Sequence, residues 1–90
     1  FTIINQYNAE HLKLIHLDIY RLSTFEELIL AGFESHLKND SVIMIEWFDK
    51  FSELMEYPHI RIEFEYTDES VRRLKFSTGS DHYRKILKQI

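Results

Sequence analysis

Two apolar runs open the chain, and each has the composition of a β-strand. Residues 1–7 are β-branched and aromatic, and Lys13 to Tyr20 is a nearly continuous apolar run. Side chains of these types favour strands. The weak alternation in the second run predicts burial on both faces, as in the sheet of an α/β protein. A turn over residues 8–11 is expected between the two strands.

Helical spacing follows the second strand. Residues 23–26, Ser-Thr-Phe-Glu, fit a capping box in which Ser23 accepts a hydrogen bond from a backbone N–H and Glu26 reaches back. The helix is expected to run to about Ala31 and to stop at Gly32. Its apolar stripe consists of Leu22, Phe25, Leu28 and Ile29. Residues 33–38 predict a second short helix.

A third strand is expected over residues 42–46, where four apolar residues are closed by an acid. This is the pattern of a buried strand. Residues 49–55 predict a helical turn, which Pro58 ends.

The last third of the chain begins with alternating apolar and charged residues. Within residues 59–67, the apolar face consists of Ile60, Ile62, Phe64 and Tyr66. Residues 71–77 predict the returning strand of an antiparallel hairpin with one solvated face. Ser80 or Asp81 is expected to cap a last helix. The inward positions of that helix are predicted to be Tyr83, Ile86, Leu87 and Ile90.

The composition is that of one small globular domain at most, with 90 residues, 44% of them hydrophobic. Cysteine is absent, which excludes a disulfide framework and a thiolate metal site and is compatible with the cytosol. No apolar run approaches the roughly 18 residues that a membrane-spanning helix needs, and the start has no signal-peptide pattern. We therefore expect a cytoplasmic protein without a membrane partner.

The charge is unevenly distributed. A net charge of −4 argues against a protein whose main work is to grip nucleic acid. Residues 46–70 hold eight acids and two bases, whereas residues 71–90 hold six bases and one acid. Such a basic end either contacts an acidic partner or a phosphate, or forms a solvated strand edge and helix face.

Two acids at the ends of apolar strands are the sharpest candidates for chemistry. Asp18 lies near the end of the second strand, and Glu46 closes the third. A strand end that aims a carboxylate at magnesium or its waters is the form of the second acidic motif of P-loop ATPases. On neighbouring strands, the two acids would converge on one divalent cation. The alternatives are a salt bridge from Asp18 to Arg21 and a core-packing role for Trp47, which follows Glu46.

Other common sites have little support in the sequence. His16 shares a strand face with Asp18, but the five histidines are scattered and no spacing completes a zinc site. No serine stands in a nucleophile-elbow setting. Gly32 and Gly79, the two glycines, cannot form the phosphate-cradling loop G-x-x-x-x-G-K-[ST]. Tight ATP binding by these 90 residues alone is therefore not expected.

These ordered motifs resemble the TsaE (YjeE) family over nearly the whole chain. They are F-T-I-I-N-Q-Y at 1–7, H-L-D-I-Y-R-L at 16–22, E-E-L at 26–28 and I-M-I-E-W at 43–47. The family comprises small bacterial P-loop ATPases that work with two proteins, TsaB and TsaD, to install threonylcarbamoyladenosine in tRNA. The resemblance implies an α/β, P-loop NTPase-like fold with a mixed central sheet and flanking helices. Because the family places its P-loop ahead of these motifs, residues 1–90 would be the C-terminal part of a single domain, lacking the N-terminal P-loop unit.

The resemblance also implies roles for individual residues. Glu46 matches the acid tied to magnesium, and Asp18 matches the second acid, near the metal and the attacking water. Trp47 matches the aromatic beside the nucleotide. Arg72 looks like the arginine on the late hairpin that approaches the nucleotide, with Arg73 as the alternative register. ATP or ADP and Mg²⁺ are the implied cofactors, TsaB and TsaD are the implied partners, and tRNA is contacted only indirectly.

Two interpretations of different classes follow. In the first, the chain is part of an ATP-hydrolysing protein and is inactive without the missing loop. In the second, it is a non-enzymatic interaction module whose acids are structural and whose hairpin and basic last helix dock a protein. The ordered motifs favour the first interpretation, and the absent phosphate loop motivates the second.

Self-association is the physical consequence of a missing P-loop unit. A sheet without that strand and helix would expose an apolar face or an unpaired edge. We therefore expect the isolated 90-residue chain to self-associate or to exchange elements between copies. Sedimentation velocity tests this, and a compact, well-behaved monomer would contradict it.

Overall fold

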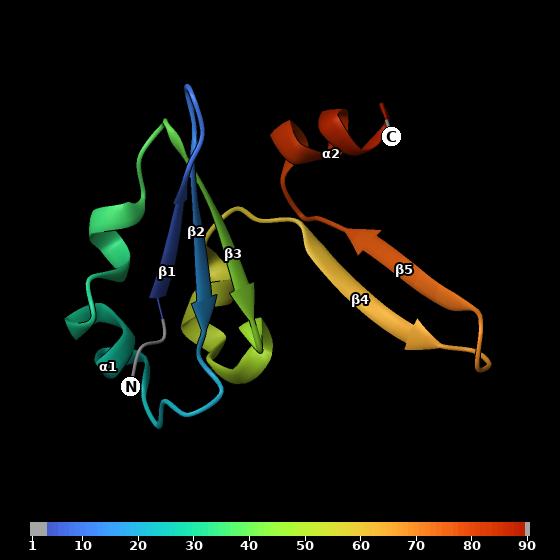
Figure 1. Ribbon diagram of the computed structural model, residues 1–90, viewed down its shortest axis with the longest axis horizontal. Helices are drawn as coiled ribbons and strands as arrows, with labels where there is room; N and C mark the ends of the chain where they lie inside the picture. Colours follow the sequence, from blue (N-terminus) through green and yellow to red (C-terminus); the bar gives the residue numbers. More distant parts are fainter. Residues whose placement is uncertain (1–3, 90) are drawn as a thin grey trace. The chain divides into compact units, whose positions relative to one another are not determined.

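The computed structural model describes residues 4–89, and its chain divides into two compact units between Leu54 and Met55. The first unit holds three strands, β1 (Ile4–Asn8), β2 (Lys13–Asp18) and β3 (Ser41–Glu46), the helix α1 (Phe25–Leu30) and the 3₁₀ helices η1 (Phe33–His36) and η2 (Phe48–Lys50) (Figure 1). A third 3₁₀ helix, η3 (Ser52–Glu56), crosses the boundary. The second unit holds β4 (Arg61–Tyr66), β5 (Arg72–Ser77) and α2 (Asp81–Leu87). The predicted strand over residues 1–7 is confirmed from Ile4, and its first three residues lie outside the described part.

The first unit is built on a mixed sheet with the strand order β1-β2-β3. β1 runs antiparallel to β2, and β2 runs parallel to β3. Parallel strands require a crossover connection, and α1 with η1 supplies it (Figure 1). The predicted α/β class with a mixed sheet is therefore confirmed.

All the buried apolar side chains of the described residues lie in the first unit. They are Ile15, Leu17, Ile19, Leu28, Phe33, Phe51 and Leu54. Along β2, Ile15 and Leu17 are buried, whereas His16 is half-buried and Asp18 is exposed. The prediction that this strand is buried on both faces is therefore wrong, because His16 and Asp18 lie on the face opposite to Ile15 and Leu17.

β3 is also not the buried strand that its apolar run predicted. Val42 and Met44 are 45% and 52% exposed, and Ile43 and Ile45 are half-buried. β3 forms an edge of this sheet, with β2 as its neighbour. Ile43 and Ile45 lie on the same face as the buried Ile15 and Leu17 and are partly covered. Val42 and Met44 lie on the other face, which is exposed.

The start of α1 uses a capping box one residue later than predicted. Thr24 is the N-cap, and its Oγ1 accepts a hydrogen bond from the Glu27 N–H at 3.3 Å. Glu27 Oε1 in turn accepts from the Ser23 N–H at 3.1 Å. The assignment of Ser23 and Glu26 to these roles is therefore wrong, because Thr24 stands three residues before Glu27 and satisfies the same spacing.

Gly32 ends this helical segment as predicted. Its φ of 98° is left-handed, a conformation in which a Cβ is disfavoured. Gly32 then precedes η1, so the predicted second helix over residues 33–38 is a shorter 3₁₀ helix.

The second unit begins with the predicted antiparallel hairpin of β4 and β5. The charged face carries cross-strand partners such as Glu65 and Arg73, whose Oε2 and Nη1 atoms are 3.9 Å apart. The opposite face, expected to be covered, is exposed in the described chain. Its exposed apolar members are Ile62, Phe64, Tyr66, Leu74 and Phe76. At the turn, the Asp68 carboxylate accepts hydrogen bonds from the N–H and hydroxyl of Ser70, which lower the pKa of Asp68.

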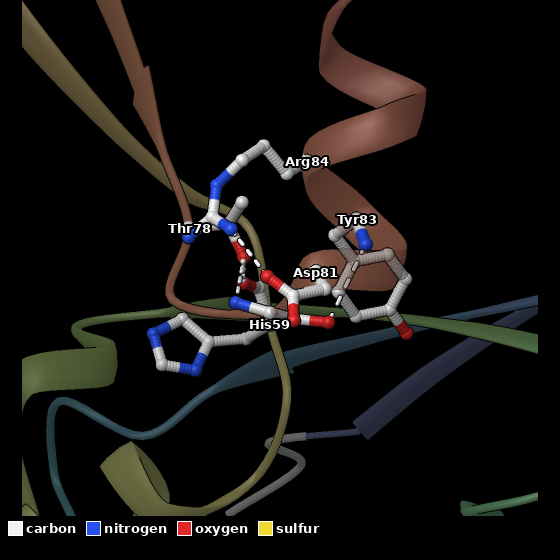
Figure 2. Close-up of polar contacts among 6 residues, drawn as sticks. His59, Thr78, Asp81, Tyr83 and Arg84 are labelled. Atoms are coloured by element: carbon white, nitrogen blue, oxygen red, sulfur yellow. Dashed lines mark hydrogen bonds and ion pairs between the residues drawn. The ribbon is translucent and has the colours of Figure 1, made fainter.

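A short network of polar contacts joins the open end of the hairpin to α2 (Figure 2). The Thr78 hydroxyl donates to the His59 carbonyl at 2.5 Å, which ties the chain before β4 to the chain after β5. Ser80 caps α2 by accepting from the Tyr83 N–H at 3.4 Å, as predicted. Within α2, Arg84 pairs with Asp81.

The inward positions of α2 are only partly as predicted. Tyr83 and Leu87 are half-buried, but Ile86 is 41% exposed, so its inward placement is wrong. Ile90 lies outside the described residues. Over residues 4–89, no helix has the length and apolar character needed to cross a membrane.

The position of the α1 cap predicts the outcome of two neighbouring substitutions. Thr24→Ala removes the oxygen that satisfies the Glu27 N–H and should lower the free energy of unfolding by about 1 kcal/mol. Ser23→Ala should cost clearly less, because Ser23 contributes through its backbone N–H, which alanine retains. Urea unfolding followed by far-ultraviolet circular dichroism measures both. An equal or larger loss for Ser23→Ala would contradict this cap.

Candidate functional site

Asp18 and Glu46 lie directly opposite each other at the carboxyl ends of two parallel strands. Their Cα atoms are paired in the β2–β3 register, so both side chains lie on the same face of the sheet. This face, here called the acid face, carries Leu14, His16, Asp18, Val42, Met44 and Glu46. The opposite face carries Ile15 and Leu17, which are buried. The core therefore directs the two acids outward together.

On the acid face, the side chain of Glu46 contacts His16. The His16 Nε2 and Glu46 Oε2 atoms are 3.2 Å apart, and the Glu46 side chain is 59% exposed. The two residues are not directly opposite, since His16 pairs with Met44 in the register. Glu46 therefore reaches back along β3 to meet His16, which gives the carboxylate a preferred direction.

Asp18 is oriented by the backbone of its own strand end. Its Oδ1 accepts a hydrogen bond from the Tyr20 N–H at 3.1 Å. A short acid that binds the backbone two residues on is a typical turn device. It fixes one oxygen of Asp18 where the chain leaves β2. The alternative pairing of Asp18 with Arg21 stays a prediction.

An aromatic pair and a lysine lie beside the two acids, on the loops that follow them. The ring centroids of Tyr20 and Trp47 are 4.8 Å apart, with an interplanar angle of 48°. The Lys50 Nζ lies 5.5 Å from the centroid of the Tyr20 ring and donates to the Tyr20 carbonyl oxygen. Contacts of these kinds each stabilise a conformation modestly, and together they fix the loops after β2 and β3 against one another.

Trp47 has an unusual backbone for a large side chain. Its φ of 66° is left-handed, and it is the one non-glycine residue with positive φ among residues 4–89. The side chain is 56% exposed, so the interpretation of Trp47 as a core residue is wrong. A bulky residue in this region is strained by about 1–2 kcal/mol, and such strain is concentrated at functional sites.

The two late arginines lie on opposite faces of the second unit's hairpin. Arg72 pairs with Tyr66 in the register, and its guanidinium carbon lies 5.1 Å from the centroid of the Tyr66 ring. Arg73 points to the charged face, where it meets Glu65. The hairpin belongs to the second unit and the acids to the first, so the role of Arg72 beside the nucleotide stays a prediction.

The donor chemistry of the acid pair fits magnesium. Mg²⁺ is usually bound by one or two carboxylates together with water and substrate phosphates. Asp18 and Glu46 supply such a pair on one face of the sheet. In the described part of the chain, no group of three or more His, Cys, Asp or Glu side chains is placed to hold a metal ion by itself. The pair therefore suits an ion whose remaining ligands come from solvent and a phosphate-bearing molecule.

Two contacts of this region were not anticipated from the sequence. The His16–Glu46 contact had a signal, since His16 and Asp18 lie two residues apart and so share a strand face. Lys50 had none, because its partner is a backbone carbonyl 30 residues away. Side-chain contacts to a distant backbone leave no pattern of residue types.

Comparison with known proteins gives a consistent result. A family model described as "Threonylcarbamoyl adenosine biosynthesis protein TsaE" matches residues 1–74. A "tRNA threonylcarbamoyladenosine biosynthesis protein TsaE" from Rickettsia felis is 34% identical, over 89% of this chain and 46% of its own length. Proteins of the same name from Haemophilus influenzae and Bacillus subtilis are 30% and 24% identical, over 78% and 100% of this chain and 44% and 56% of their own lengths. The chain thus spans about half the length of the curated relatives it matches.

The backbone of Trp47 predicts an inverted order of two small substitutions. Trp47→Gly and Trp47→Ala both remove the ring that contacts Tyr20, but only alanine keeps a Cβ in the left-handed region. Trp47→Gly should therefore be the more stable by about 1 kcal/mol. The same pair at Met44, in β3, is the control, and there glycine should be the less stable by about 0.5–1 kcal/mol. Urea unfolding tests this, and a more stable Trp47→Ala would be the opposing result.

Proposed function

The chain belongs to the TsaE family, and on this premise we propose that it is part of an ATP-binding and ATP-hydrolysing protein required for threonylcarbamoyladenosine modification of tRNA. Residues 1–90 form the C-terminal part of its single ATPase domain. TsaB and TsaD are its protein partners in the cytoplasm, and tRNA is involved only indirectly. The names of the relatives support the pathway, and the acid pair supports the chemistry.

One observation carries the proposal, namely the pairing of Asp18 with Glu46 at the carboxyl ends of parallel strands. In open α/β sheets, ligands bind outside the carboxyl ends of the strands. In our proposal, both carboxylates hold magnesium, Glu46 as the main ligand and Asp18 near the metal and the attacking water. The metal, when bound with ATP, would neutralise charge on the phosphates during phosphoryl transfer.

The other residues of the chain have supporting roles in this proposal. The exposed ring of Trp47 lies beside the nucleotide, where it offers an apolar surface next to Glu46. Arg72 approaches the nucleotide from the hairpin. His16 orients Glu46 through the Oε2 contact at 3.2 Å. The 90 residues contain no phosphate-cradling loop, so we propose that they do not hydrolyse ATP by themselves.

A non-enzymatic interaction module is the second candidate, and one observation favours it. The apolar face of the β4–β5 hairpin is exposed, with Phe64 and Tyr66 at 66% and 74%. An exposed apolar patch of aromatic residues is typical of surfaces that bind other proteins. In this alternative, Asp18 and Glu46 have structural roles only.

Titration of the natural gene product with Mg-ATP, followed by tryptophan fluorescence, separates the two candidates. The wild-type protein should give a saturable change, since Trp47 follows Glu46 directly. Glu46→Gln, which removes one charged metal ligand at constant size, should weaken binding by about tenfold or more. Glu34→Gln, at an exposed acid of η1, is the matched control and should titrate like the wild type. No response in the wild type, or an unchanged response in Glu46→Gln, would favour the interaction module.

A further inference from the structure

Lys50 joins the loop that follows β2 to the loop that follows β3. Its Nζ donates to the Tyr20 carbonyl oxygen and lies 5.5 Å from the centroid of the Tyr20 ring. Its backbone N–H donates to the Trp47 carbonyl oxygen at 2.9 Å. One residue thus has a contact on each of the two loops that leave the acid-bearing strands.

Each of these loops begins directly after an acid, Asp18 or Glu46. The Tyr20 N–H donates to Asp18 Oδ1 at 3.1 Å, so the position of Tyr20 sets the direction of Asp18. Trp47 follows Glu46 in the chain, and its ring lies against the Tyr20 ring at 4.8 Å. A continuous series of contacts therefore runs from Asp18 through Tyr20 and Lys50 to Trp47 and the end of β3.

The rings of Tyr20 and Trp47 need contacts other than burial to hold them in place. Tyr20 and Trp47 are 57% and 56% exposed, so burial contributes little to holding them. Trp47 is also in the left-handed region, which persists only where neighbouring contacts determine it. A hydrogen bond from a charged donor, with a cation near an aromatic ring, is stronger than a neutral contact at the same exposure.

We propose that Lys50 is a positioning residue that holds Tyr20 and Trp47 together and thereby sets the direction of Asp18 relative to Glu46. It acts through these two residues and not by touching a ligand, because its ammonium group is already engaged by the Tyr20 carbonyl and ring. The consequence for ATP use rests on the function proposed above, whereas the link itself concerns this chain alone.

Two measurements on the natural gene product without nucleotide test the link. The near-ultraviolet circular dichroism of the Tyr20–Trp47 pair reports ring docking, and hydrogen exchange of the Tyr20 amide reports its bond to Asp18. In Lys50→Met, the ratio of docked to undocked rings should fall roughly fivefold, and Tyr20 exchange should accelerate by a similar factor. Lys50→Arg should restore most of both signals, because a guanidinium also donates to a carbonyl and lies over a ring. Lys38→Met, at an exposed lysine between η1 and β3, should change neither.

A second variant separates the two halves of the link. Tyr20→Leu removes the ring but keeps the backbone carbonyl and N–H, so it should lose the circular dichroism signal and keep most of the exchange protection. Two results in Lys50→Met would overturn the proposal: wild-type values of both signals, or a changed ring signal with unchanged exchange of the Tyr20 amide. Both readouts are taken without ATP, so failure of ATP binding would defeat the proposed function and leave this link standing.

Discussion

Burial of Ile15 and Leu17 on one face of β2 determines the arrangement of the whole first unit. A shift of one residue in the β2–β3 register would turn every side chain of a strand to the other face. Burying one such aliphatic side chain stabilises a fold by about 1.5–3 kcal/mol. A partly exposed polar contact such as His16–Glu46 contributes about 0–1 kcal/mol. The apolar face therefore decides the register, and the acid pair is placed by side chains on the opposite face of the sheet.

The order of strands and helices could be predicted because each element has a local signal. The apolar runs marked β2 and β3, and Gly32 marked the end of the first helical segment with its left-handed backbone. Burial was harder to predict. His16 and Asp18 alternate with apolar residues in β2, which is the pattern of a strand with one solvated face. The many apolar residues around them led to the prediction that both faces are buried. The α1 cap was misplaced because Ser23 and Thr24 are both common N-caps, and Thr24 is the one used.

Only one part of the candidate site could be predicted from the sequence, namely the acids at the ends of the apolar strands. Asp18 and Glu46 were found because an acid at the end of an apolar strand is a local feature. Their pairing, the contact of His16 with Glu46 and the reach of Lys50 to Tyr20 depend on tertiary structure. The left-handed backbone of Trp47 also has no sequence signal, since a large aromatic residue is disfavoured there.

The two units are stabilised by different means. All seven buried apolar side chains of the described residues belong to the first unit. The second depends on strand pairing, on the Ser80 cap and on the hydrogen bond from Thr78 to His59 (Figure 2). Its charged face adds contacts such as Arg61–Glu63, with a Nε–Oε1 distance of 3.2 Å. Interactions of this exposed kind are weakened by salt, so salt should weaken the charged face of the second unit.

The parallel pairing of β2 and β3 also has a kinetic consequence. β1 and β2 are neighbours in sequence and can meet by closing a short turn, whereas His16 and Glu46 are separated by 30 positions. The entropy of closing that longer connection must be overcome before the two acids meet. β3 lies at an edge, so its detachment would break up the acid pair while the β1–β2 hairpin persists. Local fraying at one strand is therefore enough to separate Asp18 from Glu46 while the rest of the first unit stays folded.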